Sequence, residues 1–210
     1  MQMRTQSKKH KIIRTVLLVI LLFLIVAAGG FISVYEGRFQ TISSIQKVTD
    51  YDEYNLYRMD VKYDYDLDRL IEYGITDNQS FVDAIVKEAL PILPVHIKAP
   101  DFGCSAFTLQ EADGNVLMGR NYDFKRDTSA MLVYCEPKDG YKSVAFAALD
   151  NISANIPDAS MKKKLATLTA PFICLDGMNE KGVSIAVLTL DSEPVHQNTG
   201  AIFPQHDVRL

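Results

Sequence analysis

The sequence predicts an α+β protein preceded by one N-terminal transmembrane helix. Three observations lead to this prediction. An uncharged apolar run, Thr15–Val34, lies near the start of the chain. Strand-like and helix-like segments follow one another through residues 54–90, and from Asp101 onward the sequence reads as successive hairpins. With 210 residues, the chain is long enough for one core-forming domain with appendages.

The run 15–34 has the length and the flanks of a membrane anchor. At about 1.5 Å per residue, a helix of this length spans roughly 30 Å, the thickness of a bilayer core. Residues 1–14 are basic and contain no acid, so the positive-inside rule keeps them in the cytoplasm and exports the rest. The sequence Val26-Ala27-Ala28 leaves a cleaved signal, and a secreted protein, as the alternative. We favour a single-pass anchor in the cell membrane, because the apolar run continues to Val34.

The exported part is acidic. Five of the 22 Lys and Arg residues precede Thr15, which leaves 17 against 26 Asp and Glu residues in 15–210, a formal charge of −9. Such a domain repels phosphate backbones, which argues against a nucleic-acid partner. The membrane, through residues 15–34, is the macromolecular partner that the sequence predicts, and no oligomeric state is indicated.

Residues 35–53 are polar and are expected to form a linker. The region 54–103 is expected to be α/β, with a strand at residues 54–65 and a short helix at 66–73 that ends before Gly74. A second helix begins at Asp77 or Ser80 and runs to Leu90. Its apolar residues form one stripe at helical spacing, namely Val82, Ile85, Val86 and Ala89.

Three hairpins are expected after this region, with one helix at residues 159–168 between the second and the third. Asp-Gly at the first two turns tolerates the positive φ angles of tight hairpins. The expected pairs are 104–110 with 115–122, 130–136 with 141–149, and 171–175 with 183–190. The result is an antiparallel sheet with helices on its flank.

The chain has three cysteines, and their spacing gives no support for a metal site. No cofactor is predicted. Cys135 and Cys174 lie in apolar, strand-like segments and are interpreted as buried structural thiols, with a disulfide between them left open.

Cys104 stands apart because it begins a strand whose hairpin partner ends in Gly119-Arg120-Asn121-Tyr122-Asp123. The turn is expected to fold Arg120 and Asp123 back beside Cys104. A guanidinium favours the thiolate, and a carboxylate accepts a proton or orients an amine. Asn121 either orients substrate or stabilises the turn.

This constellation still needs a base. No histidine lies in a papain-like context. Cleavage between Gly103 and Cys104 would supply one, because the new α-amino group has a pKa of about 7.7–8.0 and lies beside its own thiol. The small Gly103 leaves room for the backbone to rearrange at this processing site.

Cys104, the Asp113-Gly114 turn and GRNYDF (119–124) together resemble the start of the mature choloylglycine hydrolase family of linear amide C–N hydrolases. That family includes bile salt hydrolases and penicillin V acylases, with acid ceramidase as a more distant relative. DGMNEKGVSIAVLTL, residues 176–190, resembles its second motif. The resemblance implies an N-terminal-nucleophile hydrolase with an αββα sandwich. Residues 104–210 would then be the N-terminal part of that domain and would form only part of the αββα sandwich. Residues 54–103 would be a prosegment.

The resemblance also implies roles for residues. Cys104 would be the nucleophile, passing through a thioester with a small N-acyl amide substrate, and its amine would be the base. Arg120 and Asp123 would be the active-site pair. Thr189 stands where many bile salt hydrolases carry an Asn, which puts the oxyanion contribution and bile salts as substrates in doubt. Asn121 and Thr189 are weak candidates for substrate or oxyanion contacts.

Two other functions remain open at this point. One is a membrane-tethered binding or scaffold protein that keeps the fold without activity. The other is a cysteine protease with a histidine base, for which His196 is the candidate.

Overall fold

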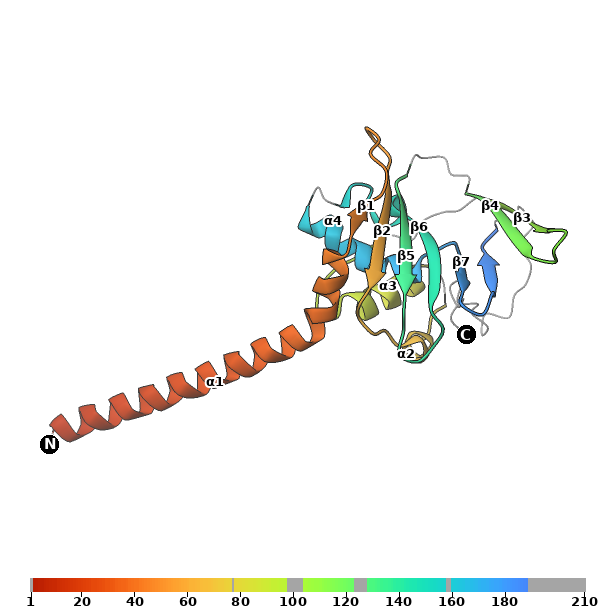
Figure 1. The fold of residues 1–210 in the computed structure, drawn as a ribbon. Helices are drawn as coiled ribbons and strands as arrows, with labels where there is room; N and C mark the ends of the chain where they lie inside the picture. The colour runs from red at the N-terminus through yellow and green to blue at the C-terminus, as the bar shows by residue number, and fades with distance from the viewer. Residues whose placement is uncertain (1, 77, 98–103, 123–127, 158–159, 189–210) are drawn as a thin grey trace.

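The computed structural model describes residues 2–76, 78–97, 104–122, 128–157 and 160–188. It is an α+β structure, as the sequence predicts. A six-stranded sheet carries helices on one face, a separate two-stranded hairpin lies beside it, and one long helix leads away from the domain (Figure 1).

The long helix α1 covers Gln2–Ser43. Residues 11–34 are exposed, and by length and composition α1 can cross a membrane or serve as a signal sequence. The helix continues through residues 35–43, which we expected to begin a linker. This extension of the helix is explained by a buried stripe of polar and aromatic residues. Tyr35, Arg38 and Thr41 recur at helical spacing and pack against the domain.

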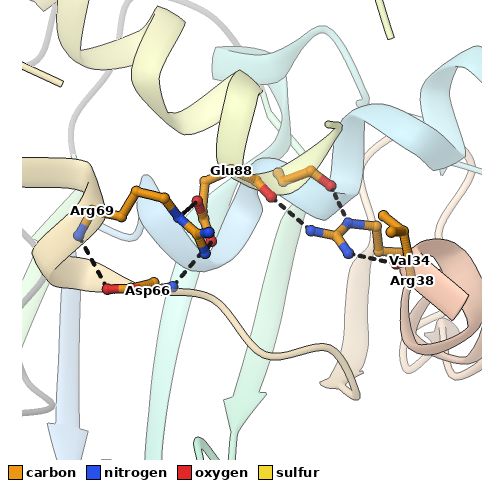
Figure 2. Close-up of polar contacts among 6 residues, drawn as sticks. Val34, Arg38, Asp66, Arg69 and Glu88 are labelled. Atoms are coloured by element: carbon orange, nitrogen blue, oxygen red, sulfur yellow. Dashed lines mark hydrogen bonds and ion pairs between the residues drawn. The ribbon is translucent and has the colours of Figure 1, made fainter. Parts of the chain in front are cut away.

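Arg38 joins the end of α1 to helix α3, which covers Asn78–Ala89 (Figure 2). Its Nε donates to the carbonyl of Ala89 at 2.6 Å, and its Nη2 donates to the carbonyl of Glu88 at 2.7 Å. The guanidinium carbon lies 4.7 Å from the centre of the Tyr63 ring. The cation thus caps the carbonyl end of α3, where positive charge is favourable.

The carboxylate of Glu88 continues this junction on its other side. It accepts two hydrogen bonds of 2.9 Å from Arg69 and one of 3.0 Å from the backbone of Asp66 (Figure 2). Asp66 in turn caps helix α2, Leu67–Glu72, by accepting from the backbone N–H of Arg69. One network therefore fixes α1, α2 and α3 to one another.

The approach of α1 to the sheet is close at Gly37. A Cβ atom at this position would lie 2.5 Å from the carbonyl oxygen of Lys62. The hydroxyl of Thr41, one turn further along α1, accepts a 2.7 Å hydrogen bond from the backbone N–H of Lys62. Only glycine leaves the space that this contact between helix and chain requires.

The six-stranded sheet has the order β1-β2-β5-β6-β7-β8. Strands β2 and β5 are parallel, and the other neighbours are antiparallel. The expectation of an antiparallel sheet is therefore wrong at β2. The strands are β1 Gln46–Lys47, β2 Leu56–Val61, β5 Ala130–Cys135, β6 Ser143–Ala148, β7 Asp176–Asn179 and β8 Ser184–Ala186.

Alternate residues of β2 and β5 point into one core. Tyr57, Met59 and Val61 are buried on β2, as are Met131 and Val133 on β5. The region 54–97 thus shares its hydrophobic core with the segment after residue 128, although the sequence suggested a separate region up to residue 103. A shared sheet, rather than a surface contact, holds the two parts together.

The helices that cover this core largely match their prediction. Helix α3 buries the whole expected stripe, and Gly74, with a φ of 70°, follows α2. Helix α4 covers Met161–Ala166, and two short 3-10 helices, η1 and η3, cover Leu149–Ile152 and Thr167–Phe172.

The last expected hairpin needs a correction. Residues 171–175 do not form a strand, because Pro171 and Phe172 end the 3-10 helix η3 and strand β7 begins only at Asp176. The reason is that every residue of η3 is buried. A fully buried apolar run shows no period that separates a strand from a helix.

The buried Arg38 gives a test of the junction. Arg38→Ala removes its hydrogen bonds to buried carbonyls and should lower the free energy of unfolding by about 3 kcal/mol. The matched control is Arg58→Ala, whose side chain is 46% exposed and should cost less than about 1 kcal/mol. Urea unfolding in detergent can be followed by tyrosine fluorescence, since the chain has no tryptophan. Equal midpoints for the two variants would show that the junction is not a stabilising contact.

Candidate active site

Cys104 begins strand β3, Cys104–Gln110, which pairs antiparallel with β4, Val116–Tyr122. The register sets Cys104 opposite Tyr122 and Ala106 opposite Arg120. Cys104 and Arg120 are therefore diagonal neighbours across the two strands. Such positions are about 7–8 Å apart and within reach of a long side chain. The prediction that the turn returns Arg120 to the start of β3 is confirmed.

Several expected site residues lie outside the described part of the chain. They are Gly103, Asp123 and Thr189, together with the side chain of Cys104. Asn121 is exposed, opposite Ser105 in the register, and its carbonyl accepts a 2.9 Å hydrogen bond from Nη1 of Arg120. Its proposed contact with substrate stays a prediction.

Arg120 connects the hairpin to the six-stranded sheet. Its side chain is 8% exposed. Its Nε donates to Oδ2 of Asp176 at 3.1 Å, and its Nη2 donates to the carbonyl of Leu175 at 3.3 Å. Because these acceptors belong to the start of β7, the guanidinium is held in one orientation by a second element.

Asp176 is the residue that sequence reasoning missed. It opens β7, its side chain is 15% exposed, and its Oδ1 accepts a 3.2 Å hydrogen bond from the backbone N–H of Phe146. Burial raises the pKa of this carboxyl above its ordinary value, although the Phe146 N–H and the Arg120 guanidinium act to lower it. The sequence signal was its place as the first residue of DGMNEKG, a lone carboxylate after the apolar run ending in Leu175.

A mostly apolar cleft of about 690 Å³ opens beside Arg120. It lies over the face of the sheet opposite the helices, where Phe146 and Met178 are 46% and 48% exposed. The residues that line it are Met118, Arg120, Thr128, Ala130, Leu132, Tyr134, Val144, Ala145, Phe146, Ala147, Ala148, Leu175, Asp176, Gly177 and Met178. An apolar wall that includes the Arg120–Asp176 ion pair suits a molecule with an apolar body and a polar group.

Other polar candidates have structural roles in the described part of the chain. Oδ1 of Asn179 accepts hydrogen bonds of 3.0 Å from the backbone N–H groups of Lys181 and Val183 and so stabilises the β7–β8 turn. Nδ1 of His96 lies 3.4 Å from a carboxylate oxygen of Asp83. His196, the candidate base of a protease, lies outside the described residues. Within the described ranges, no three His, Cys, Asp or Glu side chains are grouped to hold a metal ion.

Cys135 and Cys174 are buried free thiols, which confirms their interpretation as structural thiols. The possible disulfide between them is not formed. Burial raises the pKa of Cys135 to about 12 and that of Cys174 well above its ordinary value. The Cys174 thiol donates to the carbonyl of Ala170 at 3.2 Å. Neither thiol is suited to nucleophilic chemistry, because the thiolate is the reactive form.

Residues 104–200 match the sequence model of the linear amide C-N hydrolases, choloylglycine hydrolase family. The match begins at Cys104 and includes Arg120, Asp176 and the β7–β8 turn, so the resemblance seen in the sequence is confirmed. It supports hydrolysis of linear amide C–N bonds as the general activity. Neither the curated proteins nor the solved structures gave a match.

The buried thiols give a direct test of this geometry. At pH 8, a thiol with a pKa of about 12 is ionised to roughly one part in ten thousand. We expect iodoacetamide to leave Cys135 and Cys174 unmodified in the native protein and to modify both in guanidinium without added reductant. Peptide mass spectrometry measures both states. Modification of either thiol before unfolding would contradict its burial, and a requirement for reductant would reveal a disulfide.

Proposed function

We propose that residues 104–200, which match the linear amide C–N hydrolases, carry an N-terminal cysteine nucleophile that hydrolyses an acyl–amine bond. The observation that supports this most is the register of β3 and β4. It sets the backbone of Cys104 diagonal to Arg120, whose cation is oriented by Asp176. A cation beside a cysteine favours the thiolate, which is the reactive species.

The proposed reaction has two halves. The Cys104 thiolate attacks the amide carbonyl carbon, the C–N bond breaks, and the amine leaves with one proton, which gives a thioester. Water then attacks the thioester, releases the carboxylic acid and restores the thiol. The α-amino group of Cys104 acts as the base in both halves and Asp123 orients it. Backbone N–H groups, with Asn121 and Thr189, hold the negative charge that develops on the carbonyl oxygen.

We also infer the class of substrate and the wider fold. The apolar cleft beside Arg120 favours a small N-acyl amide with an apolar acyl group, whose carbonyl end lies towards Cys104. The six-stranded sheet, with helices on one face and an apolar opposite face, is compatible with one half of an αββα sandwich. The β3–β4 hairpin would then begin the second sheet.

We propose that α1 is an uncleaved, single-pass anchor and that the domain is extracytoplasmic. The basic residues of 1–14 support this orientation. The docking of Tyr35 and Arg38 supports retention of the anchor, since the same helix that contains the apolar run forms part of the core boundary. A secreted form cut near Ala28 is the alternative outcome.

Processing is the sharpest test of the mechanism. We expect the active protein to be cut between Gly103 and Cys104. The Cys104 thiol attacks the Gly103 carbonyl carbon, the peptide C–N bond breaks and frees the α-amine, and water hydrolyses the resulting thioester to a Gly103 carboxylate and the free thiol. N-terminal sequencing should find Cys104 as a first residue. The two pieces should elute together in detergent and separate only in guanidinium, because β2 pairs with β5 inside one sheet.

Matched cysteine variants sharpen this test. Cys104→Ala should be uncut and inactive on a panel of N-acyl amides, whereas Cys135→Ala should be cut like the unaltered protein. A fully active chain that retains Gly103 would refute the free-amine mechanism. A protein that is neither cut nor active on any member of the panel is the result expected of an inactive scaffold.

The Arg120–Asp176 pair gives a second test. Arg120→Lys keeps the charge but loses the planar fork, so turnover should fall by at least about tenfold, or about 1.4 kcal/mol of barrier. Asp176→Asn should also lower turnover, because Nε of Arg120 loses its charged acceptor. The control is Asp64→Asn, which removes an exposed partner of Lys138 and should leave turnover unchanged. Normal turnover in both Arg120→Lys and Arg120→Ala would exclude Arg120 from the reaction.

A further inference from the structure

The loop that follows α3 exposes an apolar residue in a strained conformation. Ile92 is 79% exposed, the highest value among the large apolar residues that the structure describes. Its φ is 75°, in the left-handed region that β-branched residues avoid. The neighbouring Pro91 and Pro94 add apolar surface on either side. A strained backbone that holds an isoleucine outward is not explained by packing within the domain, because Ile92 has almost no packing there.

This loop is tied to the membrane helix. The hydroxyl of Tyr35 on α1 donates a hydrogen bond to the carbonyl of Pro91, the residue next to Ile92. Tyr35 directly follows Val34, the last residue of the uncharged run, and its ring stacks on Phe31 with 4.5 Å between ring centres. The loop is therefore placed beside α1 at the point where the apolar run ends.

The junction beneath the loop fixes its position relative to α1. Arg38 binds the carbonyls of Glu88 and Ala89, only a few residues before the loop (Figure 2). Leu93 packs against the hydrophobic core, so the loop is anchored on both sides of Ile92. Helix α1 continues into the domain without a break. The position of its apolar run in the bilayer therefore sets how deep the loop lies relative to the membrane surface.

We propose that residues 91–94, which we name the apolar loop, insert Ile92 into the interface of the bilayer that α1 crosses. The proposal rests on the proposed membrane anchor. The headgroup region is about 5–7 Å thick on each side of the hydrocarbon core. The apolar loop lies at the level of Tyr35 and thus at this boundary. Its occupant is the lipid surface, because Tyr35 ties the apolar loop to the end of the exposed apolar run of α1.

The apolar loop then gives the domain a second membrane contact. One helix alone allows the domain to rotate about the membrane normal and to tilt. Two contacts fix its tilt, and with it the height of the cleft beside Arg120 above the lipid. Access to that cleft would then be limited to molecules that reach it at this height.

Site-specific fluorescence tests this proposal in the whole chain. In a Cys104→Ser background, single cysteines replace Ile92, Ile20 or Ile71 and are labelled with an environment-sensitive nitrobenzoxadiazole dye. Cys135 and Cys174 are buried and should stay unlabelled. Ile20 lies in the apolar run, and Ile71 on α2 is a matched control that is 63% exposed. The proteins are placed in phosphatidylcholine nanodiscs carrying spin-labelled lipids, which quench dyes at a known depth.

We expect a loss of fluorescence at residue 92 with a shallow spin label, a loss at residue 20 with a deep one, and no loss at residue 71. Pro94→Cys reports on the same loop if Ile92→Cys does not fold. Quenching at residue 20 without quenching at 92 or 94 would overturn the loop proposal and leave the anchor intact. Quenching at none of these positions would overturn both the anchor and the loop.

Discussion

The parallel ladder between β2 and β5 is the contact on which the rest of the structure depends. It runs over six residue pairs, from Leu56 with Ala130 to Val61 with Cys135. A parallel pair cannot be closed by a short turn, so a long crossover must join the two strands. That crossover contains α2, α3 and the β3–β4 hairpin. Cys104 and Arg120 therefore belong to a connection whose two ends are fixed inside one sheet.

Local sequence signals predicted the elements but not their assembly. The stripe of α3 and the Asp-Gly turns are encoded within a few neighbouring residues, and both were predicted correctly. The placement of β2 beside β5 was not, because it depends on residues more than seventy positions apart. The buried face of residues 35–43 was also missed, since Tyr35, Arg38 and Thr41 replace the aliphatic residues that usually mark a helix–core contact.

The candidate site likewise combines one contact that local sequence predicts with one that it does not. Cys104 and Arg120 are joined by one hairpin, so the sequence indicated their proximity. Asp176 lies fifty-six positions after Arg120 and reaches it only through the register of β6 and β7. A guanidinium contributed by one sheet and its carboxylate contributed by another cannot be paired from spacing alone. Their contact gives the first carboxylate of DGMNEKG a structural role, because it orients the guanidinium of Arg120.

Gly37 carries a consequence for how such a protein varies. The helix can lie on the chain at Lys62 only while residue 37 has no side chain. A substitution there would leave every proposed reacting group intact and would still change the angle between α1 and the rest of the domain. For the membrane-anchored protein proposed above, we expect such a change to alter which molecules reach the cleft, and to leave the reaction itself unchanged. Residue 37 would thereby influence access of molecules to the cleft, although it belongs to none of the proposed reacting groups.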